Sequence, residues 1–147
     1  MSPVGRFRFS LETVLKVRGL REEQAKAEVA RAQQELERSH LALAQTLNLR
    51  SRLLAELQAG GKEWTTQDFR IFKSYLDHLK AGIEGYKQKI VGQEQDLQEK
   101  KEILKQRYQE RRLLERLRQK QYAQFRRKLM KDMEKETEAI VLGRWNR

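Results

Sequence analysis

The sequence has no cysteine, a single proline and few aromatic residues. Proline occurs once in 147 residues, as Pro3, and Phe, Trp and Tyr together make up 7%. Without cysteine, the chain cannot form disulfides, thiol nucleophiles or cysteine-ligated zinc sites. So few large apolar side chains favour helices that bury a narrow stripe over a globule with a deep core.

Long hydrophobic runs are also missing. No stretch approaches the roughly 18 apolar residues that a membrane-spanning helix needs, and residues 1–8 are not followed by the apolar segment of a signal peptide. We therefore expect a protein that is made and kept in the cytoplasm.

Charged residues are abundant, at 36% of the chain. Together with Ala, Leu and Gln they give a composition typical of long helices and coiled coils. The first helix is predicted over about residues 10–58, with the Ser10 hydroxyl as its cap and Glu12 in its first turn. Nine of the fourteen a and d positions of its heptad repeat are apolar. These positions are Leu11, Leu15, Arg18, Glu22, Ala25, Val29, Ala32, Leu36, Ser39, Leu43, Thr46, Arg50, Leu53 and Leu57.

A loop is predicted over residues 59–66, because Gly60 and Gly61 end the first helix. Thr65 and Asp68 resemble a capping box, so a second helix is predicted over about residues 67–141. Residues spaced by three and four form its apolar seam, the stripe expected to face the first helix, and after Leu104 this register is expected to slip. The seam residues are Phe69, Phe72, Leu76, Leu79, Ile83, Tyr86, Ile90, Gln93, Leu97, Lys100 and Leu104.

Two amphipathic helices joined by one short loop should fold back on each other. The predicted fold is all-α: residues 1–147 form a single, long, antiparallel two-helix coiled-coil hairpin with a stalk-like form. Residue i should lie opposite residue 125 − i, which places Leu11 near Leu114. Residues 118–142 should then extend beyond the N-terminus.

The net charge of +11 is concentrated at the C-terminal end of the chain. Residues 105–147 carry 14 basic and 6 acidic groups, whereas residues 61–104 carry 8 of each. A basic segment with interleaved aromatics can bind nucleic acid, an anionic membrane or an acidic protein surface, or can be the solvated flank of a coiled coil.

No pattern in the sequence predicts catalysis. The two histidines, His40 and His78, are not expected to meet, and paired helical carboxylates are expected to form i,i+4 ion pairs. Phosphate loops, nucleophile elbows and dinucleotide fingerprints are missing. We predict no enzyme activity, no catalytic residue, no cofactor and no metal.

The opening of the chain carries more specific information. Residues 7–18, FRFSLETVLKVR, resemble the start of the FliJ family of bacterial flagellar export proteins, and the segment FKSYLDHL (residues 72–79) is similar to that family's aromatic-Leu segment. Residues 110–120, ERRLLERLRQK, are similar to its C-terminal pattern. Residues 140–147 depart from the family, and Glu136 and Glu138 are the nearest equivalents of its acidic pair.

This resemblance implies a component of the flagellar type III export apparatus, and so of flagellum biogenesis, motility and chemotaxis. Family members are stalk-like coiled coils that insert their terminal end into the hexameric ring of the export ATPase and promote its activity. They also contact the cytoplasmic ring of the export gate and handle export chaperones. The implied location is the cytoplasm and the cytoplasmic face of the inner membrane, reached only through the export apparatus, with no nucleic acid as partner.

Two sites follow from combining the resemblance with the residues. The first would bind the ATPase at the end that carries both termini, and comprises Phe7, Phe9, Leu11, Leu15, Arg18, Arg116, Arg118, Arg126 and Arg127. Its aromatic residues could instead only staple the start of the helix. The second, Trp64 and Tyr75, would contact the export gate, because these aromatics lie off the predicted seam.

Two alternatives to the flagellar function stay open at the level of sequence. One is the equivalent stalk protein of a virulence type III secretion system. The other is a basic coiled coil that binds nucleic acid or has a structural role, for which binding to DNA would weaken steeply with salt.

Overall fold

The computed structural model describes residues 5–60 and 63–145. It contains two α-helices, α1 (Glu12–Gln58) and α2 (Thr66–Trp145). Residues later in α1 contact residues earlier in α2, because Glu12 bonds to Arg118 whereas Glu28 pairs with Lys100. The prediction of an all-α, antiparallel two-helix hairpin is therefore confirmed. Gly61 of the expected loop and residues 146–147 of the tail lie outside the described residues.

The contacts divide the chain into two compact units, and each unit contains a segment of both helices. Unit 1 consists of Met1–Gln24 and Lys105–Arg147, and unit 2 of Ala25–Leu104.

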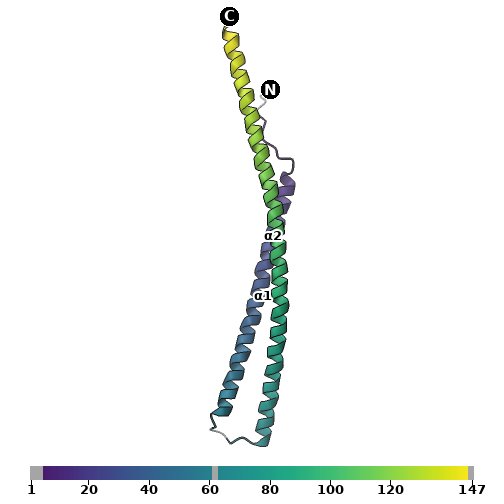
Figure 1. The fold of residues 1–147 in the computed structure, drawn as a ribbon, viewed down its shortest axis with the longest axis vertical. Helices are drawn as coiled ribbons and strands as arrows, with labels where there is room; N and C mark the ends of the chain where they lie inside the picture. Colours follow the sequence, from purple (N-terminus) through teal and green to yellow (C-terminus); the bar gives the residue numbers. More distant parts are fainter. Residues whose placement is uncertain (1–4, 61–62, 146–147) are drawn as a thin grey trace. The chain divides into compact units, whose positions relative to one another are not determined.

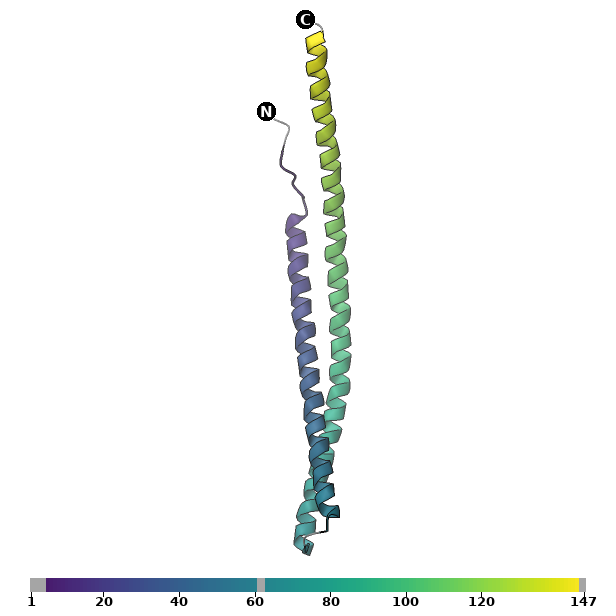
Figure 2. The same ribbon diagram turned by 90° about the vertical axis from the view of Figure 1, so that its left-hand side faces the viewer.

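Unit 2 is held together by an apolar seam. Within it α1 and α2 run alongside each other in Figure 1, and in Figure 2 they overlap toward the loop. From α1 the seam buries small side chains, which allow close approach, and from α2 it buries larger ones. The buried apolar residues are Ala25, Val29, Ala32, Phe72, Leu79, Ile83 and Ile90.

The connection between the helices follows the local chemistry of its residues. The Ala59 N–H donates to the Ala55 carbonyl (3.0 Å), and Gly60 then has a φ of 65°, a left-handed conformation that glycine adopts without steric penalty. At the start of α2 the Asp68 N–H donates to the Thr65 hydroxyl (3.1 Å), and the Thr65 N–H donates to the Asp68 carboxylate (3.2 Å). The predicted capping box is thus confirmed.

The start of α1 differs from the prediction. The helix begins at Glu12, two residues later than expected, and the Glu12 N–H donates to the Phe9 carbonyl (3.1 Å). A backbone carbonyl therefore accepts from the first N–H of the helix, whereas the Ser10 hydroxyl was predicted as the cap. The helix partners are also displaced from the simple 125 − i rule, because Glu12 bonds to Arg118 and not to a residue near position 113.

The predicted heptad of α1 agrees with the structure throughout. All fourteen of its a and d positions are buried or partly buried. On α2 the agreement extends from Phe72 to Leu104, but Phe69 is 52% exposed, so its place in the seam was wrong.

The expected register slip after Leu104 was also wrong. The same spacing of three and four continues through Arg107, Arg111 and Leu114, all partly buried, whereas Tyr108 and Tyr122 are exposed. Apolar residues were expected in this part of the seam, and Leu114 is one, but arginines occupy positions 107 and 111.

Ile83 is the most buried residue of the core, at 2% exposure, and provides a test of the unit 2 seam. Replacing Ile83 by Ala should lower the free energy of unfolding by about 2–3 kcal/mol, because the lost methyl groups leave a cavity. Ile71→Ala is the matched control, since Ile71 is 63% exposed, and should change stability by less than about 0.5 kcal/mol. Urea unfolding followed by circular dichroism measures both. Equal effects of the two substitutions would show that the seam is not where the structure has it.

Candidate docking surfaces at the terminal and loop ends

The seam of unit 1 contains ion pairs as well as apolar residues. Arg111 donates through Nε to Glu22, and Arg18 donates through Nη1 to Glu110. Arg118 donates to the Glu12 carboxylate at 2.9 Å. Arg18 and Glu22 occupy d and a positions of α1, so these pairs stand where a coiled coil normally buries apolar side chains.

Glu22 is the most deeply placed of these charged groups, with 5% of its side chain exposed against 23% for Arg111. Arg111 also pairs with Glu115 at 2.6 Å. The hydrogen bond from Arg111 to Glu22 raises the pKa of the guanidinium further above its usual range. The hydrogen bond from Arg18, together with its charge, lowers the pKa of the Glu110 carboxyl. These interactions therefore favour the ionised forms of Arg111 and Glu110.

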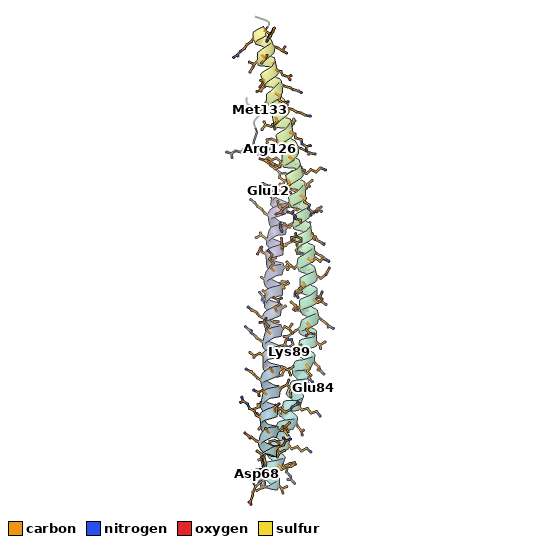
Figure 3. The ribbon with its side chains drawn as sticks, turned by 60° about the vertical axis from the view of Figure 1, so that its left-hand side comes forward. Glu12, Asp68, Glu84, Lys89, Arg126 and Met133 are labelled. Carbon is orange, nitrogen blue, oxygen red and sulfur yellow. The ribbon has the colours of Figure 1, made fainter. Side chains whose placement is uncertain are left out.

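An aromatic cluster lies beyond the ion pairs, between the N-terminal segment and α2. The Phe7 ring contacts Tyr122 edge to face, with centroids 5.2 Å apart, and Phe125 at 5.7 Å. Phe9 is buried, at 7% exposure. The segment before α1 is thus anchored to α2 by aromatic packing. In Figure 3, Arg126 and Met133 lie on the part of α2 that continues past Glu12, where α1 begins.

All nine residues of the predicted ATPase-binding site belong to unit 1, and we call them the terminal site. They differ in their accessibility. Phe7, Phe9, Leu11 and Leu15 are buried or partly buried between the N-terminal part and α2, and Arg18 and Arg118 are held in ion pairs. The members that are exposed and form no ion pair within the described residues are Arg116, Arg126 and Arg127.

The second predicted site, Trp64 and Tyr75, belongs to unit 2, and we call it the loop-end site. Trp64 packs edge to face on Phe72, with centroids 5.2 Å apart, and Tyr75 is 42% exposed. Both aromatics line one open pocket of about 350 Å³. Its other lining residues are Glu63, Asp68, Ile71 and Phe72.

Sequence reasoning overlooked Ile71. This residue is 63% exposed and lies between the loop-end pocket and a neighbouring groove that it lines with Tyr75 and His78. The search for interface anchors considered only aromatic side chains. The spacing of Ile71, Tyr75 and His78, four and then three residues apart, could have indicated a shared exposed face.

The accessible features of the described residues are thus surfaces on a two-helix coiled coil, and this is the class of protein that the fold defines. Within the described residues, neither helix is long and apolar enough to cross a membrane. The chain matches the family model described as Flagellar FliJ protein over residues 7–147, and it belongs to that family. It is therefore a stalk-type protein of flagellar type III export, and the family is a non-catalytic component of the export apparatus. Comparisons with curated proteins and with solved structures give no significant match.

The buried pair of Glu22 and Arg111 generates a test of the ionic seam. Arg111→Leu should lower the free energy of unfolding by about 1–3 kcal/mol, because it removes a charged donor from a buried carboxylate. Adding Glu22→Leu should recover most of this loss, since an apolar pair of similar volume replaces a buried ion pair at little net penalty. Chemical unfolding of the wild type, both single variants and the double variant measures the coupling. Strictly additive effects would contradict a direct interaction.

Proposed function

We propose that this protein is a stalk-like adaptor of the flagellar export apparatus. In this role its terminal site binds the hexameric export ATPase and promotes assembly and activity of the ring. Its loop-end site contacts the cytoplasmic ring of the export gate. The observation that carries the proposal is the family match over residues 7–147, combined with exposed docking groups in both units.

The ATPase contact is supported by a difference in accessibility among the residues of the terminal site, some of which are packed and others exposed. The aromatic and aliphatic members hold the N-terminal segment against α2, while Arg116, Arg126 and Arg127 present their guanidinium groups to solvent. Exposed arginines on a firmly packed element suit an acidic or polar ring lining through complementary charge. In this proposal the aromatic residues staple the N-terminal segment, and the exposed arginines dock against the ring.

The gate contact is supported by the loop-end pocket. An exposed Tyr75 next to Trp64 and Ile71 provides an apolar recess with Glu63 and Asp68 in its lining. Such a recess can accept one apolar side chain of a partner, and Tyr and Trp contribute strongly at the centres of interfaces.

The remaining parts of the proposal concern location and cargo. The protein is cytoplasmic and peripheral at the cytoplasmic face of the inner membrane, where the export apparatus holds it. Export chaperones are further partners. The flagellar family match favours this role over the equivalent one in a virulence secretion system.

The ATPase contact predicts a specific effect of charge reversal. Arg126→Glu with Arg127→Glu should raise the concentration needed for half-maximal stimulation of the purified export ATPase by about tenfold or more, because two attractive contacts become repulsive. Neither side chain forms an ion pair in the described residues, so helicity should be preserved. Lys80→Glu with Lys101→Glu, on exposed positions of unit 2, changes the net charge equally and should leave stimulation unaltered. Full stimulation by the folded Arg126/Arg127 variant would refute the assignment.

The gate contact predicts a separable defect. Tyr75→Ala should weaken binding to the purified cytoplasmic domain of the gate by about 1–2 kcal/mol and slow export, while ATPase stimulation stays normal. Tyr108→Ala is the control, since Tyr108 is similarly exposed, at 47%, but belongs to unit 1 and is not in the lining of the loop-end pocket. Calorimetry for the gate and an ATPase assay on the same preparation give both readouts. If gate binding is unchanged, or if both activities fall with thermal stability, Tyr75 has a packing role only.

A further inference from the structure

Unit 1 carries exposed aliphatic side chains that neither the seam nor the terminal site uses. On α1 these are Val14, Val17 and Leu20, which are 40%, 42% and 67% exposed. Their spacing of three residues arranges them in an arc that leads from the flank of the seam to the outer side of the helix. Solitary exposed aliphatics are ordinary on a protein surface, but a contiguous group on one helix is not.

The second helix contributes aliphatics to the same side of the unit. Leu113 is 70% exposed and Leu117 is 37% exposed. They follow Glu110 by one and two helical turns, and Glu110 is bonded to Arg18. Val14 precedes Arg18 by one turn, and the helices are antiparallel, so Val14 and Val17 lie along the flank that Leu113 and Leu117 also occupy. We call these five residues the lateral patch: Val14, Val17, Leu20, Leu113 and Leu117.

The charges around the lateral patch have one sign. Arg21 is one turn beyond Val17 on α1, and Lys120 is one turn beyond Leu117 on α2. Both are exposed, and neither forms an ion pair within the described part of the chain. The acidic group on this flank, Glu110, is already engaged by Arg18. The patch is therefore apolar along its centre and positive at its margins.

We propose that the lateral patch binds one amphipathic helix of another protein, with aliphatic residues on its contact face and acidic residues beside them. A helix lying along the flank of two antiparallel helices can place its apolar stripe over both aliphatic rows. Its carboxylates would then pair with Arg21 and Lys120, which gives the interface its specificity. The occupant would pack as a third helix against unit 1.

A lipid surface fits these observations less well. Interfacial helices insert a broad apolar face that includes Trp, Phe or Leu over several turns. The lateral patch covers about two turns of α1, from residue 14 to residue 20, and contains no aromatic residue. A protein helix needs only this limited contact when charge pairs flank it.

The test uses two synthetic, fluorescein-labelled helical peptides of about five turns. Both carry leucines in a heptad pattern, and they differ only in having glutamates or lysines beside the leucines. The full-length protein should bind the glutamate peptide in fluorescence anisotropy and should bind the lysine peptide at least about tenfold more weakly. Val17→Gln with Leu113→Gln should weaken binding of the glutamate peptide by about tenfold or more.

The controls separate the patch from general effects on the fold. Leu41→Gln with Val91→Gln changes equally exposed aliphatics in unit 2 and should leave binding unaltered. Gln is a good helix former, so circular dichroism should be unchanged in both double variants. Arg21→Glu with Lys120→Glu should reverse the preference, so that the lysine peptide binds better than the glutamate peptide.

Several results would overturn the proposal. One is equal binding of both peptides by the wild type, and another is unchanged affinity of the folded Val17/Leu113 variant. A third is a protein that binds neither peptide but binds phosphatidylserine vesicles, with vesicle binding lost in the Val17/Leu113 variant. That result would identify a membrane surface as the occupant. Self-association that the Val17/Leu113 variant abolishes, measured by sedimentation without peptide, would identify a second copy of the chain as the occupant.

Discussion

The structure depends on the seam between α1 and α2, because each helix has only one stripe of residues that can leave water. A third element that could cover the remaining surface is lacking in the described residues, and the core contains no large side chain below 2% exposure. Stability must therefore come from a long series of small contacts, such as those of Ala25, Val29 and Ala32 with the larger residues of α2. The same geometry leaves every other face of the helices accessible to partners.

Different interactions hold α1 and α2 together in the two units. Unit 2 buries apolar side chains, whereas unit 1 relies on the pairs Glu12–Arg118, Arg18–Glu110 and Glu22–Arg111 and on the aromatic cluster around Phe7. Ion pairs contribute less net stability than apolar contacts of equal size, and salt screens them. A unit held in this way tolerates a highly basic surface, because part of its charge is neutralised internally while exposed arginines stay available.

Much of the fold could be predicted from the sequence, because the heptad spacing and the glycine break are local signals. The positions of Leu11 to Leu57 and the Thr65–Asp68 cap needed no knowledge of distant contacts. Prediction was less successful after Leu104, since the rule that seam positions are apolar does not recognise Arg107 and Arg111 as seam residues. Arg111 bonds to Glu22, which lies 89 positions away in the chain, and that pairing becomes visible only when the helix alignment is known.

The candidate sites show the same limit. Composition and family resemblance indicated which residue types would dock, but not which of them had already found a partner within the chain. Arg18 and Arg118 were grouped with Arg126 and Arg127 because all four are cations near the termini, yet the first two are engaged by Glu110 and Glu12. The exposed Ile71 and the lateral patch were overlooked because only aromatic side chains were considered as interface anchors.

The ion pair of Arg18 with Glu110 has a consequence for the alignment of the two helices. A heptad repeat is degenerate, since sliding one helix by seven residues leaves most apolar contacts in place. Sliding α2 by one heptad in either direction would put Ile103 or Leu117 where Glu110 now stands. Arg18 would then face an aliphatic side chain and lose its hydrogen bond, so a misaligned hairpin is disfavoured by a discrete step in free energy. The charged residues inside the seam thus determine which of several nearly equivalent helix registers the folded chain adopts.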